Sequence, residues 1–141
     1  MEGTAPAISL RQRSARRESA TNRWRIAWTV ENHGKAPLEL SSARLPHGQF
    51  KSDQQSFVPM LRMAGGAAED FETSVRCEEA PGPVTENAFM IFEANWQGAP
   101  WRIFVRIRVD VLHDGDPNTA VQSITSQRVG FSQHLQTNED G

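Results

Sequence analysis

The sequence predicts an all-β fold, namely a single antiparallel β-sandwich of seven to eight strands. Apolar and polar residues alternate with a period of two in stretch after stretch of the chain. Segments rich in glycine, proline, asparagine and aspartate separate these stretches, and no segment shows sustained apolar recurrence at helical spacing. With 141 residues and 38% hydrophobic content, the chain can form one domain around one core.

The first strands follow from this alternation. An initial strand is expected from Ile8 to about Ser19. Residues 24–30 place tryptophan, isoleucine and valine on one face and mostly polar residues on the other, which is typical of a half-buried strand. Asn32, His33 and Gly34 then favour a tight turn, so we expect a hairpin between residues 24–30 and 38–45.

The middle of the chain is less regular. Residues 51–55 are wholly polar and are expected outside a strand. A short strand is expected over residues 57–63, where Pro59 confines it to a sheet edge because proline has no N–H to donate. Residues 71–77 alternate again and place the Cys77 thiol on the inward face.

The second half of the chain carries the most apolar strands. Residues 88–96 are apolar on both faces over their first half, which indicates a central or covered strand. In residues 101–112 the odd positions are apolar, so we expect Trp101, Ile103, Val105, Ile107, Val109 and Val111 to point inward. Each buried side chain of this kind contributes about 1.5–3 kcal/mol, so this strand and residues 24–30 should anchor the core. Residues 121–131 are expected to form the last strand.

This order of hairpins, the proline-bearing edge strand and a tryptophan opposite a long apolar strand resemble bacterial immunoglobulin-like sandwiches. The families that it resembles are fibronectin type III modules, the bacterial cell-adhesion-related domain and the intracellular proteinase-inhibitor type. The resemblance covers about residues 7–132 and concerns architecture, because the chain has one cysteine and no tyrosine, and so has neither the cysteine pair nor the tyrosine corner of antibody domains. Residues 1–6 and 133–141 are expected to be disordered.

Composition excludes several classes of function. A single cysteine excludes a disulfide framework within the chain, and no apolar run is long enough for a membrane-spanning helix. No secretory signal is visible, so a cytoplasmic location is expected. The basic residues Arg11, Arg13, Arg16 and Arg17 lack interleaved aromatic residues and the net charge is −2, so neither nucleic acid nor membrane is an expected partner.

The sequence offers no convincing chemistry. The four histidines, His33, His47, His113 and His134, fall in predicted turns or near the tail without metal-ligand spacing. There is no nucleophile elbow, no complete calcium loop and no glycine-rich turn that opens a helix. We therefore expect no catalytic residue, no metal and no cofactor, and a non-enzymatic protein.

One sheet face stands out as a candidate interface. If the odd residues of 101–111 and the even residues of 90–96 point inward, a mixed apolar and charged set shares the outer face. This set is Phe89, Ile91, Glu93, Arg102, Phe104, Arg106 and Arg108. Arginine and aromatic residues around an apolar patch are typical of protein interfaces, which predicts an interaction or accessory module with a protein partner or a homodimer. In the alternative, Glu93 pairs with an arginine across the strands while residues 51–55 or the N-terminal strand cover Phe89 and Ile91.

A second hypothesis places a site at one end of the sandwich. Trp96 and Trp101 flank the turn at residues 97–100 and could stack on a sugar or another flat ligand, with His33 and His47 nearby. This reading predicts a small-ligand, carbohydrate-type binding domain or a hydrolase. A third possibility, an inhibitor of a cytoplasmic protease, rests on fold analogy.

Overall fold

A computed structural model describes residues 4–18, 23–46, 50–77, 86–112 and 115–130. These residues form eight antiparallel strands, and no helix occurs within the described ranges, so the all-β prediction is confirmed. The strands are β1 (Ile8–Arg17), β2 (Arg23–Asn32), β3 (Leu38–Leu45), β4 (Phe50–Met63), β5 (Ala68–Cys77), β6 (Glu86–Trp96), β7 (Ala99–Val111) and β8 (Pro117–Arg128).

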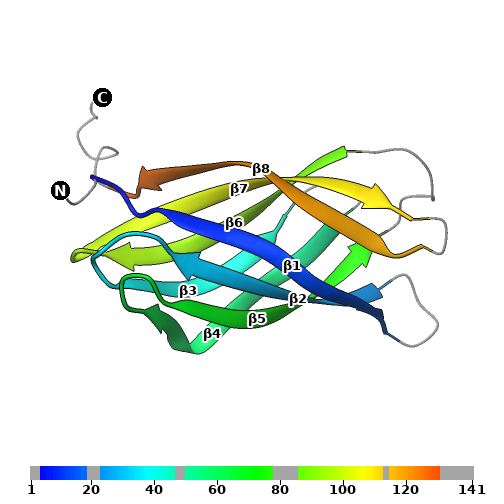
Figure 1. The fold of residues 1–141 in the computed structure, drawn as a ribbon, viewed down its shortest axis with the longest axis horizontal. Helices are drawn as coiled ribbons and strands as arrows, with labels where there is room; N and C mark the ends of the chain where they lie inside the picture. Colours follow the sequence, from blue (N-terminus) through cyan, green and yellow to red (C-terminus); the bar gives the residue numbers. More distant parts are fainter. Residues whose placement is uncertain (1–3, 19–22, 47–49, 78–85, 113–114, 131–141) are drawn as a thin grey trace.

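The eight strands form one sheet in the order β1-β2-β5-β4-β3-β6-β7-β8, which curls into a nearly closed barrel (Figure 1). β4 joins the two halves of this sheet. Its first residues, Phe50 and Lys51, pair with Cys77 and Arg76 of β5, whereas the strand from Ser52 onward pairs with β3. One half of the wall is therefore β1-β2-β5 and the other is β3-β6-β7-β8.

The prediction of a hairpin between residues 24–30 and 38–45 is wrong. β2 pairs with β1 on one side and with β5 on the other, so β2 has no free edge for β3. The chain instead crosses to the opposite half of the sheet after β2. The Asn32 side chain fixes this crossing, because its amide donates to the carbonyls of Ala36 and Met63 at 2.9 and 3.1 Å and accepts from Gly34 N.

β4 is longer than expected, because the polar residues 51–55 belong to it. Between the pairs Leu40–Leu61 and Ser42–Ser56, β3 advances by two residues and β4 by five, so residues 57–60 form a wide bulge. The bulge contains the cis Val58–Pro59 bond and leaves Val58 90% exposed. Phe57 points inward and packs edge-to-face on Phe71 at 5.4 Å between ring centroids.

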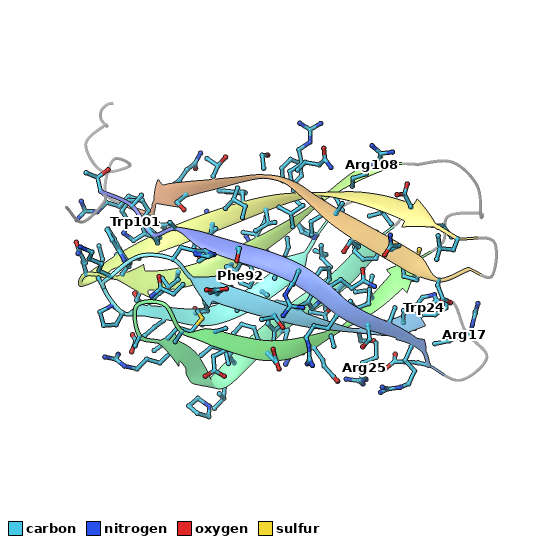
Figure 2. The ribbon with its side chains drawn as sticks, in the orientation of Figure 1. Arg17, Trp24, Arg25, Phe92, Trp101 and Arg108 are labelled. Atoms are coloured by element: carbon cyan, nitrogen blue, oxygen red, sulfur yellow. The ribbon has the colours of Figure 1, made fainter. Side chains whose placement is uncertain are left out.

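The predicted parity of residues 101–111 is confirmed. The odd positions are buried, Arg106 and Arg108 are exposed, and Ile103, Val105, Ile107 and Val109 have no exposed surface. Met90, Phe92, Ala94 and Trp96 of β6 and the apolar residues of β2 fill the interior with them. Trp24 and Trp101 lie at opposite ends of the core (Figure 2).

The two outermost strands of the sheet order, β1 and β8, are held together by a side chain. The Gln12 amide donates to the carbonyl of Pro117 at 3.1 Å, and its oxygen accepts from Thr119 N at 3.0 Å and from Thr119 Oγ1 at 2.8 Å. Ser126 Oγ also donates to the carbonyl of Pro6, a buried residue just before β1. Gln12 stands where the β1–β2 register shifts, so this irregularity turns its side chain toward β8.

Candidate interaction face

The predicted interface residues lie together on the outer surface of β6 and β7. Ile91 is opposite Phe104, Phe89 is opposite Arg106, and Glu93 is opposite Arg102. We call the whole set the arginine–phenylalanine face: Phe89, Ile91, Glu93, Arg102, Phe104, Arg106 and Arg108. The face forms because successive side chains in β6 and in β7 point to opposite sides of the sheet, so every second side chain of each strand points away from the core.

The three apolar residues of this face differ in burial. Phe89 is 39% exposed and Phe104 is half-buried, whereas Ile91 is only 7% exposed. Ile91 lies between Arg44 of β3 and Phe104 of β7 in the register, so its neighbours on the same face shield it. Neither expected cover lies over Phe89, since residues 51–55 belong to β4 and the N-terminal strand β1 pairs with β2.

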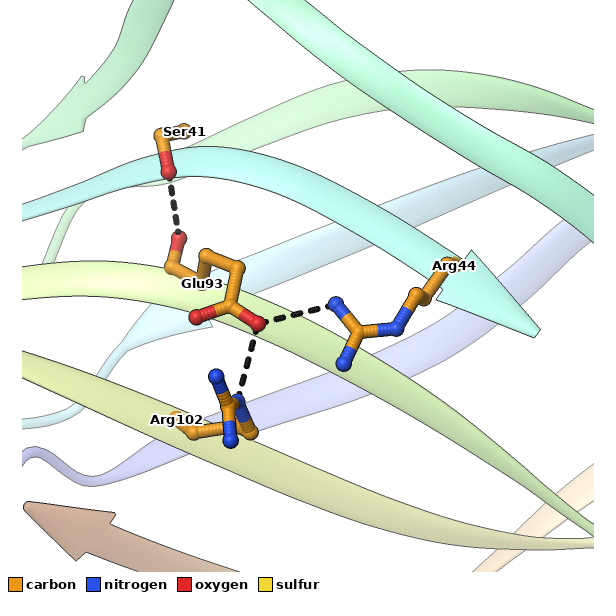
Figure 3. A network of polar contacts seen from close by, with 4 residues as sticks. All are labelled: Ser41, Arg44, Glu93 and Arg102. Carbon is orange, nitrogen blue, oxygen red and sulfur yellow. Dashed lines mark hydrogen bonds and ion pairs between the residues drawn. The ribbon is translucent and has the colours of Figure 1, made fainter. Parts of the chain in front are cut away.

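A carboxylate organises the polar part of the face (Figure 3). Arg44 Nη1 donates to Glu93 Oε2 at 2.8 Å and Arg102 Nε donates to the same oxygen at 2.9 Å. Ser41 Oγ donates to the backbone carbonyl of Glu93 at 3.2 Å. Partial burial raises the pKa of Glu93, but the hydrogen bonds and charges of the two arginines outweigh it, so this pKa lies below its ordinary value. The cross-strand pairing of Glu93 with an arginine, expected in the alternative reading, is therefore present.

The charge on this side of the molecule is positive. Four arginines, Arg44, Arg102, Arg106 and Arg108, face two carboxylates, Glu93 and Asp110, which leaves a net charge of +2. Arg108 Nε is 3.8 Å from Asp110 Oδ1, and the two side chains are 50% and 36% exposed, so this pair is weak and open to competition. The arrangement thus combines an exposed aromatic ring with exposed guanidinium groups, which suits a ligand that is apolar and acidic.

The two tryptophans of the alternative end site are buried and pack on each other. Trp96 and Trp101 pack edge-to-face at 5.7 Å between centroids and are 4% and 9% exposed. Their indole N–H groups are buried without a hydrogen-bond partner among the described residues. The exposed His33 has its Nε2 2.8 Å from Ser9 Oγ, and His47 lies outside the described residues.

A shallow hollow does lie beside Trp96. It has a volume of about 400 Å³ and is lined by Ala36, Pro37, Glu39, Arg62, Asn95, Trp96, Gln97 and Gly98. Arg62 and Glu39 form an ion pair of 2.6 Å in its wall. Among the described residues named for the end site, Trp96 lines this hollow and Trp101 and His33 do not, and ligand binding there stays a prediction.

The remaining sequence predictions concern the cysteine, metal sites and the other histidines. Cys77 is buried on the inward face, as expected, and is not part of a disulfide. In the described part of the chain no three His, Cys, Asp and Glu side chains gather as a metal site, and no helix there could span a membrane. His113 and His134 lie outside the described residues.

Sequence reasoning missed Arg44 and Ser41 as parts of the face. Simple alternation from Leu38 would place the even residues of β3 inward, including Arg44. The register of β3 shifts between Leu40 and Ser42, however, and this shift turns Arg44 outward. No signal in the sequence marks the shift except the pair of serines, which are small and polar.

Comparisons with known proteins do not assign a family. No protein-family model matches the chain, and no curated protein matches it. A matching solved structure is described as "X-ray structure of Northeast Structural Genomics Consortium target SoR45". It shares 11% sequence identity, and the match covers 92% of this chain and 89% of that chain with a TM-score of 0.29.

Proposed function

We propose that the protein is a non-catalytic interaction module that binds a protein partner through the arginine–phenylalanine face. The observation that carries this proposal is the 39% exposure of Phe89 directly opposite Arg106, which is itself exposed. Large aromatic side chains and arginines are the residues that contribute most to protein interfaces. The ion pairs of Glu93 hold Arg102 in place beside the apolar residues, so this part of the face is ordered before a partner arrives.

The partner we propose is a different protein that presents an apolar side chain flanked by carboxylates. An apolar group would cover Phe89, and carboxylates would pair with Arg106 and Arg108. A second copy of the same face would bring like charges together, since the face and its surroundings carry a net charge of +2. Charge complementarity therefore favours an acidic partner over a homodimer.

The immunoglobulin-like assignment and the cytoplasmic location are also parts of this proposal. In constant-type immunoglobulin domains the strand orders are A-B-E-D in one sheet and C-F-G in the other. The orders β1-β2-β5-β4 and β3-β6-β7 correspond to these sheets, with β8 added beside β7. This correspondence supports an immunoglobulin-like topology whose two sheets are joined through β4. The cytoplasmic location rests on the sequence alone.

Selection from a displayed library of random peptides tests the function. We expect the selected peptides to combine aspartate or glutamate with an aromatic or aliphatic residue. Phe89→Ser and Arg106→Glu should each weaken binding of a selected peptide at least about tenfold, because each removes a contact at the centre of the face. Met60→Ser is the matched control, since Met60 is 42% exposed but lies on β4 outside the face.

Three outcomes would overturn the proposal. Selected peptides could lack carboxylates, or could bind the Phe89→Ser and Arg106→Glu variants as well as the unchanged protein. Sedimentation could also show a dimer that Phe89→Ser abolishes, which would mean that a second copy occupies the face.

A further inference from the structure

A cluster of exposed apolar residues lies on the wide bulge of β4, apart from the arginine–phenylalanine face. Val58 is 90% exposed and Met60 is 42% exposed, and Pro59 between them is exposed as well. Apolar surface in contact with water is unfavourable, and neighbouring exposed apolar side chains are typical of interaction surfaces. The bulge is therefore a second candidate for a contact with another molecule.

A hollow lies beside these residues. It is lined by residues 55–62 of β4 and by Glu69 of β5, and its volume is about 600 Å³. It lies between β4 and β5, beyond the point where the two strands stop pairing. The seven residues of the arginine–phenylalanine face are not among the residues that line it. The bulge thus presents a projecting side chain, Val58, next to a recess with room for a side chain.

The two charged residues that line the hollow have opposite signs. They are Arg62 of β4 and Glu69 of β5, and both are exposed. Arg62 pairs with Glu39 at 2.6 Å, but its side chain is 64% exposed, and a guanidinium has five N–H donors and can hold a second carboxylate. Among the described residues, the Glu69 carboxylate has no ion pair. The lining has no net charge.

A projection, a recess and two opposite charges on one surface suit a two-fold interface. In such an interface the same surface occurs on both copies, so each group of one copy can meet its complement on the other. The arginine–phenylalanine face lacks this property, because two copies of it would bring like charges together. The whole chain has a net charge of only −2, so long-range repulsion between two copies is weak.

We propose that two copies of the chain associate through the β4 bulge as a two-fold dimer. Val58 of each copy enters the hollow of the other, and Arg62 of each copy pairs with Glu69 of the other. Side chains make the contact, because Pro59 has no N–H with which to pair a strand. One bulge is smaller than the roughly 800 Å² per partner of a standard interface, so we expect a dissociation constant on the order of 100 µM. This proposal does not rest on the proposed function.

Sedimentation equilibrium of the whole chain, from about 10 µM to about 1 mM, tests the dimer. We expect the average mass to rise from that of the monomer toward that of the dimer. Val58→Asp should weaken association at least about tenfold, because it places a charge in an apolar contact. Leu112→Asp is the matched control and should associate as the unchanged protein does, since Leu112 is 44% exposed and lies outside the hollow. An unchanged melting temperature shows that each variant is folded.

A charge exchange tests the two-fold arrangement. Arg62→Glu and Glu69→Arg should each weaken self-association at least about threefold, because each brings like charges together across the interface. At the same total concentration, an equimolar mixture of the two variants should associate more strongly than either variant alone. In the mixed dimer, two carboxylates of one copy face two guanidinium groups of the other, so opposite charges meet again.

Four outcomes would overturn the dimer. The chain could stay monomeric at about 1 mM. A dimer could form that Val58→Asp leaves unchanged, or one that Phe89→Ser abolishes, which would place the contact elsewhere. The mixture of charge variants could also associate no better than its components. A peptide selected on the arginine–phenylalanine face should bind Val58→Asp as tightly as it binds the unchanged protein, so failure of one proposal can be told from failure of the other.

Discussion

Truncation of Gln12 should loosen the contact between β1 and β8. The substitution Gln12→Ala removes three hydrogen bonds, one to Pro117 and two from Thr119. Each such bond contributes about 1 kcal/mol net, which sets an upper value of about 3 kcal/mol. The bonds are part-buried and water replaces some of them, so we expect a loss of about 2 kcal/mol. For a chain of this length that corresponds to a fall in melting temperature of roughly 8 °C.

Urea unfolding followed by tryptophan fluorescence measures this loss, and hydrogen exchange at the Thr119 amide locates it. Gln122→Ala is the matched control, because Gln122 is an exposed glutamine of β8, and its effect should stay within about 0.5 kcal/mol. Gln12→Glu keeps the acceptor for Thr119 but, while ionised, loses the donor to Pro117, so at pH 7 it should fall between Gln12→Ala and the unchanged protein. A loss below about 0.5 kcal/mol for Gln12→Ala, with the Thr119 amide still protected, would refute the role of this side chain.

Three further substitutions should each have a separate effect. Thr73→Val should cost about 1–3 kcal/mol, because it leaves the buried Trp28 indole N–H, now 3.0 Å from Thr73 Oγ1, without an acceptor. Glu93→Gln should lower stability by about 1 kcal/mol at pH 7, and the difference should vanish on acidification, since a carboxyl with a lowered folded pKa loses its contribution as pH falls through that pKa. Gly65→Ala should destabilise the protein by about 2 kcal/mol, because an added Cβ would lie 2.5 Å from the carbonyl oxygen of Lys35.

Thermal unfolding at several pH values measures all three effects, and the threonine and glycine substitutions each have a matched control. Thr29→Val tests an exposed hydroxyl, bonded to Asp70 at 2.7 Å, and should cost less than Thr73→Val. Ala64→Ser tests the neighbouring turn without a backbone clash and should be near neutral. Equal losses for the two threonine variants would contradict the role given to Trp28, a pH-independent difference for Glu93→Gln would contradict its ion pairs, and a neutral Gly65→Ala would contradict the close approach.

Much of the fold could be predicted because long alternation fixes which residues face inward. Eleven residues from Trp101 to Val111 keep one phase, and a one-residue slip would have exposed the apolar side chains at all the odd positions. The pairing of β2 could not be predicted in the same way. The turn signals after Asn32 are local, whereas the partners of β2 lie before it in β1 and some forty residues later in β5.

In the candidate face, too, the local pairing could be predicted and the long-range contact could not. Glu93 and Arg102 are opposite each other because the turn between β6 and β7 is short and fixes the register of the two strands. Their pairing could therefore be predicted from the sequence. Arg44 joins them from β3, which is not adjacent to β6 in the chain, and a register shift decides its direction.

The wide bulge of β4 bears on how the molecule avoids aggregation. Only Phe50 and Lys51 of β4 are in register with β5 among the described residues, so the later part of the strand would present an open edge to other chains. Pro59 lacks the N–H that an incoming strand would need, and the bulge interrupts the regular spacing of the groups on either side of it. Strand addition by another chain, the first step toward fibrils, is therefore hindered where β4 and β5 separate.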